Sequence, residues 1–103
     1  MFGGQGTAST MAIGVTNDMW EFNLITGQWS WVNGANTTDQ LGTYGTVGNP
    51  STGIIPVARF GSARLTDASG NYWLFGGHGL ATNLVVSNLN DLFKFNPVTS
   101  EWT

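Results

Sequence analysis

Hydrophobic and polar positions alternate with a period of two along two short segments of the chain. In residues 18–22 the aromatic side chains of Trp20 and Phe22 alternate with a methionine and a glutamate. Residues 91–95 repeat this alternation with two phenylalanines. A period of two is typical of β-strands, because successive side chains of a strand point to opposite faces of the sheet. The pattern therefore predicts an all-β chain.

Residues 71–76 contain an uninterrupted apolar run that starts at Tyr72, as expected for a strand covered on both faces. Gly70 precedes this run, and a glycine can adopt the positive φ of a tight hairpin. Pro97 lies outside a strand, because proline cannot donate a hydrogen bond to a ladder. The expected strands cover residues 18–22, 29–32, 58–66, 71–76, 91–95 and 102–103, and residues 5–16 and 78–89 are expected to be long loops.

The chain contains an internal duplication. Residues 17–29 align with residues 90–102 at an offset of 73 residues. The tripeptide at residues 2–4 falls on residues 75–77 at the same offset. Because two separate blocks share one offset, the alignment indicates a repeat, and repeats of this kind are typical of stacked architectures.

The duplicated segment resembles the kelch repeat, in which a diglycine ends an apolar strand and a tryptophan follows an aromatic strand. Six residues separate Phe22 from Trp29, and six separate Phe95 from Trp102. Kelch units run to about 50 residues, so the period of 73 residues indicates an insertion. The resemblance is to bacterial kelch-like proteins with extended loops. It implies structural roles for Gly3, Gly4, Phe22, Trp29, Arg59, Gly76, Gly77, Phe95 and Trp102.

The predicted fold is all-β, with about one and a half four-stranded antiparallel blades of a kelch-type β-propeller. Residues 1–32 form a partial blade with strands b, c and d, residues 33–57 a long inter-blade loop, and residues 58–103 a second blade with strands a to d. A single blade is apolar on both faces and has to be stacked. We therefore expect part of a larger propeller or array. A designed or fragment-derived self-assembling chain and a homopolymeric fibre are the alternatives.

Composition narrows the partners that the chain can bind. The net charge is −3 and the cations are Lys94, Arg59 and Arg64, too few to neutralise a phosphate backbone. No run approaches the ~18 apolar residues of a membrane span. Cysteine is absent, so no disulfide framework is predicted. A cysteine-free chain rich in Thr and Asn is typical of secreted or cell-surface bacterial proteins.

Candidate ligand-binding residues lie on the predicted loops, because loops on a rigid scaffold tend to carry binding residues. In an up-and-down blade, the b–c and d–a loops share one face of the molecule, and both are expected to be long here. The candidates are Asn36, Asp39 and Tyr44 in the d–a loop and His78 and Asn83 in the b–c loop.

The sequence contains no pattern that predicts catalysis. His78 is the single histidine and Gln5 takes its place in the first repeat, so a structural polar role is favoured over ligand contact. One histidine without cysteine supplies too few ligands for a transition-metal site. A Ser-His-Asp set, a phosphate-binding loop followed by a helix and paired carboxylates are also missing. We therefore predict no enzyme activity, no metal and no cofactor.

Three charged residues have expected structural roles. Asp18 and Asp91 recur at equivalent positions, so their side chains are expected to bond backbone amides of the b–c loop. Calcium binding is the alternative for these two residues. Arg59 is expected to pair with an acid of a neighbouring blade or to line the propeller channel.

The predicted function is a non-catalytic kelch-repeat module that binds or scaffolds a protein or glycan through its b–c and d–a loop face. Its immediate partners are other blades of a parent chain or identical copies. A structural repeat unit of a self-assembling homo-oligomer is the first alternative. A non-catalytic part of a galactose-oxidase-like enzyme is the second.

Overall fold

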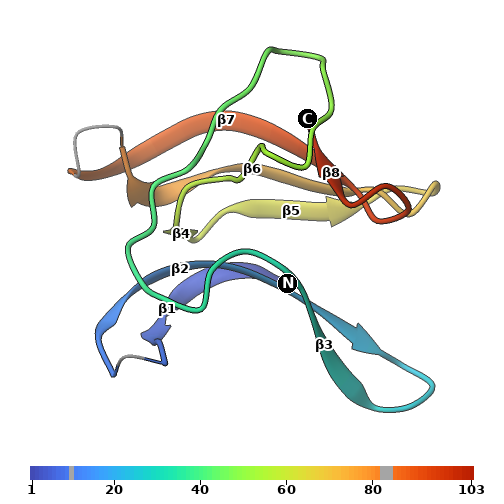
Figure 1. Ribbon diagram of the computed structural model, residues 1–103, viewed down its shortest axis with the longest axis horizontal. Coiled ribbons are helices and arrows are strands. Elements are labelled where there is room, and N and C mark those ends of the chain that lie inside the picture. Colours follow the sequence, from blue (N-terminus) through green and yellow to red (C-terminus); the bar gives the residue numbers. More distant parts are fainter. Residues whose placement is uncertain (10, 82–84) are drawn as a thin grey trace.

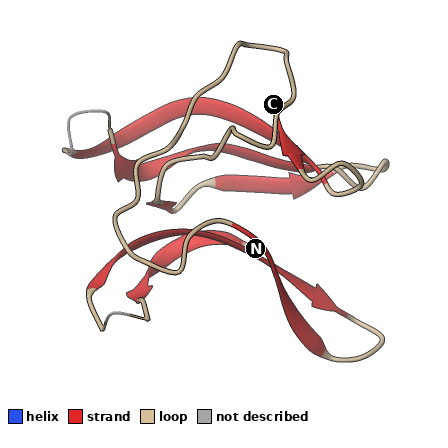
Figure 2. Cartoon of the chain, in the orientation of Figure 1, coloured by secondary structure: helices blue, strands red, loops and turns tan. Residues whose placement is uncertain are grey.

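The computed structural model describes residues 1–9, 11–81 and 85–103, and every regular element in these ranges is a β-strand (Figure 1; Figure 2). Three strands form sheet 1, in the order β1-β2-β3. Sheet 2 has the order β4-β6-β7-β8, with β5 also paired to β6. Each strand pair is antiparallel, which confirms the predicted all-β class. The strands are β1 (Phe2–Thr7), β2 (Ile13–Asn23), β3 (Gln28–Asn33), β4 (Arg59–Phe60), β5 (Ala63–Thr66), β6 (Tyr72–Leu80), β7 (Val86–Asn96) and β8 (Glu101–Trp102).

The backbone reproduces the duplication found in the sequence. β2 and β7 are both 11 residues long, and their bounds differ by the repeat offset at both ends. The ladder shifts register at the diglycine in both sheets, between Phe2 and Gly4 and between Phe75 and Gly77. In the glycine type of bulge one residue has a positive φ, which glycine adopts at little cost. Gly3 and Gly76 both have φ of 58°.

The prediction of long b–c loops is wrong. β1 continues to Thr7 and β2 begins at Ile13, while β6 continues to Leu80 and β7 begins at Val86. Both connections are therefore short. Ladder hydrogen bonds are made by the main chain, so polar and glycine-rich residues extend the strands without an apolar pattern.

The predicted first strand of the second blade, residues 58–66, is divided into β4 and β5. Gly61 lies between the two strands with φ of 68°. Both halves pair with β6, so they occupy one edge of sheet 2.

The two sheets stack face to face, as Figure 1 shows, and the core lies between them. Trp102 occupies the middle of this core, with its ring edge-on to Phe2 of sheet 1 at 5.5 Å between centroids. Within sheet 2 the same ring lies 5.0 Å from Phe95. The buried cluster consists of Phe2, Met19, Ile54, Leu74, Phe93, Phe95 and Trp102.

The linking segment, residues 34–58 between β3 and β4, is packed against the sheets. Ile54 and Val57 are buried, and Ile54 belongs to the core cluster. The main chain of Ser51 exchanges two hydrogen bonds with Trp102, at 3.0 and 3.3 Å, so the segment covers the free edge of β8. An unpaired strand edge is a template for aggregation. The predicted inter-blade loop thus protects an edge and completes the core.

The hairpin turns follow the predicted turn chemistry. Gly70 has φ of 83°, as expected for the β5–β6 turn. Asp67 organises this turn, because its Oδ1 accepts hydrogen bonds from the amides of Ser69 and Asn71 at 3.0 and 2.9 Å. Its Oδ2 accepts from Trp73 Nε1 at 2.9 Å. The hydrogen bonds from Trp73 and Asn71 lower the pKa of Asp67 to about 2.

Candidate functional site

The most buried charge in the described chain belongs to Arg59 of β4, whose side chain has no exposed surface. Its Nη1 and Nη2 lie 2.5 and 2.8 Å from the two carboxylate oxygens of Asp91 on β7. Nε donates to the carbonyl of Val57 at 3.0 Å, and Nη1 also donates to the carbonyl of Gly76 at 3.1 Å. Bidentate pairing of this kind holds both side chains in one geometry. The network joins β4, β6 and β7.

Tyr44, in the linking segment, extends the network. Its hydroxyl donates to Asp91 Oδ2 at 2.6 Å, and its ring lies 5.6 Å from that of Phe93. Burial alone raises the pKa of Asp91, but hydrogen bonds from Arg59 and Tyr44 outweigh burial and lower it. Burial and the bond to Asp91 raise the pKa of Tyr44. Asp91 is therefore ionised and Tyr44 protonated near neutral pH.

Two expectations for these residues are corrected. Asp91 binds a buried guanidinium rather than the backbone amides of the b–c loop, because the side chain of Arg59 is fully buried and its donors need acceptors inside the protein. The partner of Arg59 lies in the same sheet rather than in a neighbouring one. In sheet 1 the equivalent carboxylate, Asp18, accepts a hydrogen bond from Trp20 Nε1 at 2.7 Å, a side-chain donor that the sequence analysis did not consider.

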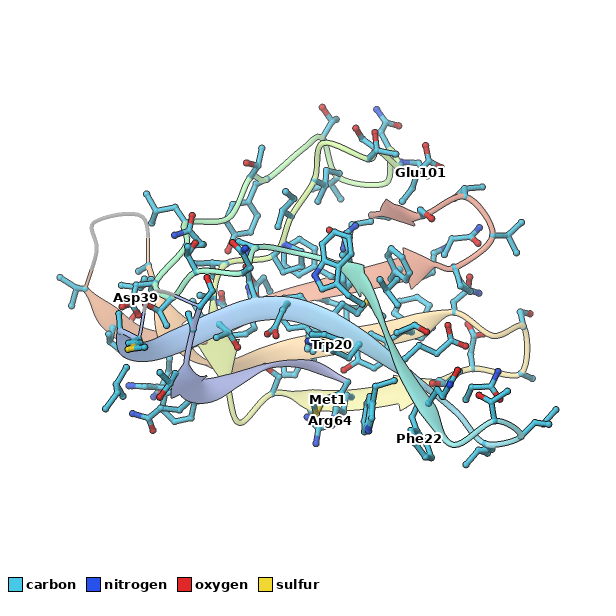
Figure 3. All side chains as sticks on the ribbon, turned by 60° about the horizontal axis from the view of Figure 1, so that its bottom comes forward. Met1, Trp20, Phe22, Asp39, Arg64 and Glu101 are labelled. Carbon is cyan, nitrogen blue, oxygen red and sulfur yellow. The ribbon has the colours of Figure 1, made fainter. Side chains whose placement is uncertain are left out.

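Asn36 and Asp39 hold the linking segment against the β1–β2 hairpin. The carbonyl of Asn36 accepts a hydrogen bond from Ser9 Oγ at 2.9 Å. Asp39 Oδ1 accepts from the amide of Val15 at 3.0 Å, and the amide of Asp39 donates to the Val15 carbonyl at 2.7 Å. Figure 3 shows Asp39 beside the start of β2. The side chain of Asp39 and the main chain of Asn36 therefore have structural partners.

The remaining candidates lie apart from these. His78 Nδ1 is 3.0 Å from Asn88 Oδ1 across the β6–β7 ladder, and its ring lies 5.3 Å from that of Phe60. Asn83 lies outside the described residues. Of the described candidates, Tyr44 alone lines the groove beside Asp91. The structure thus does not gather the predicted site residues into one cleft.

That groove has a volume of about 430 Å³ and continues onto sheet 2. Lys94 lies in it with Nζ 5.8 Å from the centre of the Trp73 ring. Its walls are mainly apolar, and the carboxylate of Asp91 is already engaged by Arg59 and Tyr44. The groove is lined by residues that include Tyr44, Val47, Ile54, Trp73, Leu92 and Lys94.

The outer face of sheet 2, turned away from sheet 1, exposes large apolar side chains. Phe75 and Leu92 are opposite each other on neighbouring strands and are 52% and 58% exposed. Leu65 on β5 is also exposed. The repeat equivalents of Phe75 and Leu92 in sheet 1 are Phe2 and Met19, which are 4% and 7% exposed. The same positions are thus buried in sheet 1 and open in sheet 2.

The outer face of sheet 1 shows the reverse relation. Phe22 and Trp29 are opposite each other and stack at 5.0 Å, with an interplanar angle of 45°. Their equivalents Phe95 and Trp102 also stack at 5.0 Å, at 49°. The first pair is 42% and 54% exposed and the second pair 1% and 1%. Figure 3 places Phe22 near the β2–β3 turn.

Further aromatic residues enlarge this outer face. Trp20 and Trp31 are directly opposite each other, on the same face as Phe22 and Trp29. Trp31 is exposed. Large exposed apolar patches mark interaction sites in soluble proteins. The candidate functional surfaces of this chain are therefore the two outer sheet faces.

Comparisons of the chain with protein-family models, with curated proteins and with solved structures find no match. The kelch resemblance rests on the duplicated diglycine and aromatic motif, and the function has to be inferred from the residues themselves. Within residues 1–9, 11–81 and 85–103, no three His, Asp or Glu side chains are grouped to hold a metal ion. No helix in the described part of the chain could span a membrane.

Sequence reasoning considered Arg59, Asp91 and Tyr44 separately and missed the network that joins them. Arg59 and Asp91 lie 32 residues apart, and Tyr44 and Asp91 lie 47 apart. A repeat-based signal existed only for Asp91, since neither Arg59 nor Tyr44 has an equivalent in the first repeat.

Proposed function

We propose that the chain is a non-catalytic kelch-type repeat module that acts as a scaffold, and that its sheets are blades made to stack on further sheets of the same kind. The observation that carries this proposal is the contrast between two equal aromatic pairs. Phe95 and Trp102 are buried beneath sheet 1, whereas Phe22 and Trp29 are open. A face with this composition is stable when a neighbouring sheet covers it.

The strand order supports the comparison with a kelch blade. In sheet 2, β4 and β5 together take the place of strand a, and β6, β7 and β8 take the places of strands b, c and d. In sheet 1, β1, β2 and β3 correspond to strands b, c and d. The diglycine bulge lies in β1 and β6, the two strands that would be strand b of a kelch blade. At Gly3, an added Cβ would collide with the carbonyl oxygen of Arg59, so this glycine allows the close approach of the two sheets.

The charged network supports the non-catalytic part of the proposal. Arg59 and Asp91 neutralise each other, and the hydroxyl of Tyr44 donates a hydrogen bond to the same carboxylate. The low pKa of Asp91 and the high pKa of Tyr44 keep both groups in one protonation state around neutral pH. A general acid or base works best with a pKa near the operating pH. These groups are therefore suited to holding β4, β7 and the linking segment together.

Recognition of a protein or glycan is a second candidate function, favoured by the groove between the linking segment and sheet 2. Tyr44 and Trp73 present aromatic surface there, and Val47 is fully exposed at its rim. Because the b–c connections are short, the ligand would meet residues 41–55 rather than a face built from two sets of long loops.

The scaffold proposal can be tested by adding one repeat to the chain. Residues 31–103 would be appended after Thr103, which continues the duplication in register. In a stacked array, stability grows with each added interface, so we expect a higher denaturant midpoint and a single cooperative transition. Amide hydrogen exchange should show new protection in the first copy of β6 and β7.

The matched control is the same fusion with Phe75→Thr and Leu92→Thr in its first copy. These changes remove apolar surface at the new junction while threonine keeps a high strand propensity. The control should lose the added stability. If the unmodified fusion instead unfolds at the midpoint of the single chain, with no new protection, the stacking proposal is overturned.

A further inference from the structure

We infer that the outer face of sheet 2 in one molecule binds the outer face of sheet 1 in a second copy of this chain. The inference rests on the proposed stacking function and names the partner and the surfaces. Both outer faces carry exposed apolar side chains whose repeat equivalents are buried in the internal interface. Each outer face should therefore be covered by the other outer face of a second molecule.

The internal interface provides the template for this contact. Inside one molecule, Phe2 of sheet 1 packs edge-on against Trp102 of sheet 2 at 5.5 Å. The repeat equivalent of Phe2 is Phe75, and the equivalent of Trp102 is Trp29. Phe75 of one copy should therefore pack against Trp29 of the next copy in the same edge-on geometry.

A second pair follows from the same template. Met19 and Phe95 belong to the buried cluster between the sheets. Their equivalents, Leu92 and Phe22, are 58% and 42% exposed. Together these residues give four apolar side chains that are open in the single molecule and that would form the equivalent cluster between two molecules.

The contact between copies is smaller than the contact within one copy. Sheet 1, as described over residues 1–9 and 11–33, has three strands and no counterpart of β4 and β5. The next molecule therefore contributes less surface than sheet 2 does internally. We therefore expect the contact between copies to be weaker than the contact within one copy.

The contact is also heterologous, because one molecule contributes the face of sheet 2 and the other the face of sheet 1. Heterologous contacts extend into open arrays or close into rings, whereas isologous contacts stop at a dimer. Each molecule keeps one unsatisfied face after pairing. Assembly should therefore continue beyond two copies as the concentration rises.

Sedimentation velocity of the 103-residue chain tests this inference, over roughly 1 to 500 µM. The weight-average sedimentation coefficient should rise with concentration and should not stop at the dimer. Two double variants each block one face: Phe75→Thr with Leu92→Thr, and Phe22→Thr with Trp29→Thr. All four side chains are at least 42% exposed in the single molecule, so both variants should keep the far-UV circular dichroism of the parent chain.

Mixing these variants is the decisive measurement. Each variant retains one functional face, so each should remain a monomer when alone, and the two together should form a 1:1 heterodimer that does not grow. The matched control is Ile25→Thr with Val98→Thr, which alters equivalent turn residues that are 96% and 90% exposed. The control should assemble like the parent chain.

Three results would overturn the inference: a parent chain that stays monomeric at all concentrations, a single-face variant that still associates, or a mixture that forms no heterodimer. These three results are obtained without the fusion that tests the stacking function, so the two proposals can fail separately. A stabilised fusion together with a monomeric parent chain would preserve the stacking function and reject self-association. A fusion with unchanged stability would reject the stacking function itself.

Discussion

The two sheets carry the same aromatic pair, and one copy is buried while the other is exposed. Phe95 and Trp102 lie in the core, and Phe22 and Trp29 lie on the surface, although the ring geometry of the two pairs is nearly the same. The hairpin therefore sets the pair geometry locally. Whether the pair is removed from water depends on a neighbouring sheet. Most of the hydrophobic stabilisation from the pair depends on that burial.

The equivalent acids show a similar divergence. Asp91 holds a buried guanidinium, whereas Asp18 accepts one hydrogen bond from a tryptophan side chain. Sheet 2 has β4 beside β6, and β4 supplies Arg59 to this site. The same residue in the same position of the repeat thus has a different partner where the neighbouring strand is different.

The largest expected difference between the sheets concerns the tryptophans. Trp102→Ala should cost about 3–5 kcal/mol, because it removes a large side chain from the core and leaves a cavity. Trp29→Ala should cost about 1 kcal/mol, since Trp29 is half exposed. Urea denaturation at low micromolar protein concentration measures both values. Equal losses would show that the two sheets are equally buried in solution and would break the comparison.

The second largest difference in stability loss is expected between the two equivalent aspartates, Asp91 and Asp18. Asp91→Asn should cost about 3 kcal/mol at neutral pH, because it leaves the charge of Arg59 buried without a counterion. Asp18→Asn should cost about 1 kcal/mol or less, as the amide oxygen can still accept from Trp20. Denaturation of both variants at pH 7 gives the comparison.

The effect of Asp91→Asn should also depend on pH, in a direction set by the lowered pKa of Asp91 in the folded chain. The ionised carboxylate stabilises the fold fully above its ordinary pKa of 3.8, and this contribution is lost as the pH falls through the lower folded value. The difference between parent and variant should therefore shrink below about pH 4. A difference that stays constant down to pH 2 would contradict the ion pair.

The smallest expected effect compares the β2–β3 and β7–β8 turns. Gly27 and Ser100 are repeat equivalents, with φ of 69° and 58°. A side chain in this region costs about 1–2 kcal/mol, which the greater unfolded-state entropy of glycine partly offsets. Ser100→Gly should therefore stabilise the chain by up to about 1 kcal/mol, and Gly27→Ser should destabilise it by a similar amount. Thermal denaturation followed by circular dichroism checks both signs.

Much of the fold could be predicted from local chemistry. The alternation around Trp20 and Phe93, the turn glycines and the duplication predicted antiparallel strands at nearly the right positions. Strand ends were predicted less well. The ladder continues through Gly6 and His78 by main-chain pairing, which leaves no apolar signal in the sequence.

The candidate site was predicted less well than the fold. Asn36 and Asp39, which were expected to contact a ligand, also hydrogen-bond to the first hairpin, Asn36 through its main-chain carbonyl, while Tyr44 reaches Asp91 across 47 residues. These long-range hydrogen bonds depend on how the linking segment folds back onto the sheets. Polarity and a position in a loop do not distinguish a residue that binds the chain itself from one that binds a ligand.

The sequence by itself determined the approximate positions of the strands, the turns, the repeat and the pairing of an aromatic residue with a tryptophan across each hairpin. These features depend on residues that are neighbours along the chain or across one turn. The tertiary structure alone decided which repeat is buried, that Arg59 meets Asp91, and which two faces remain open. Burial and ion pairing depend on the element that lies opposite in space, and two identical motifs differ as soon as their neighbours differ.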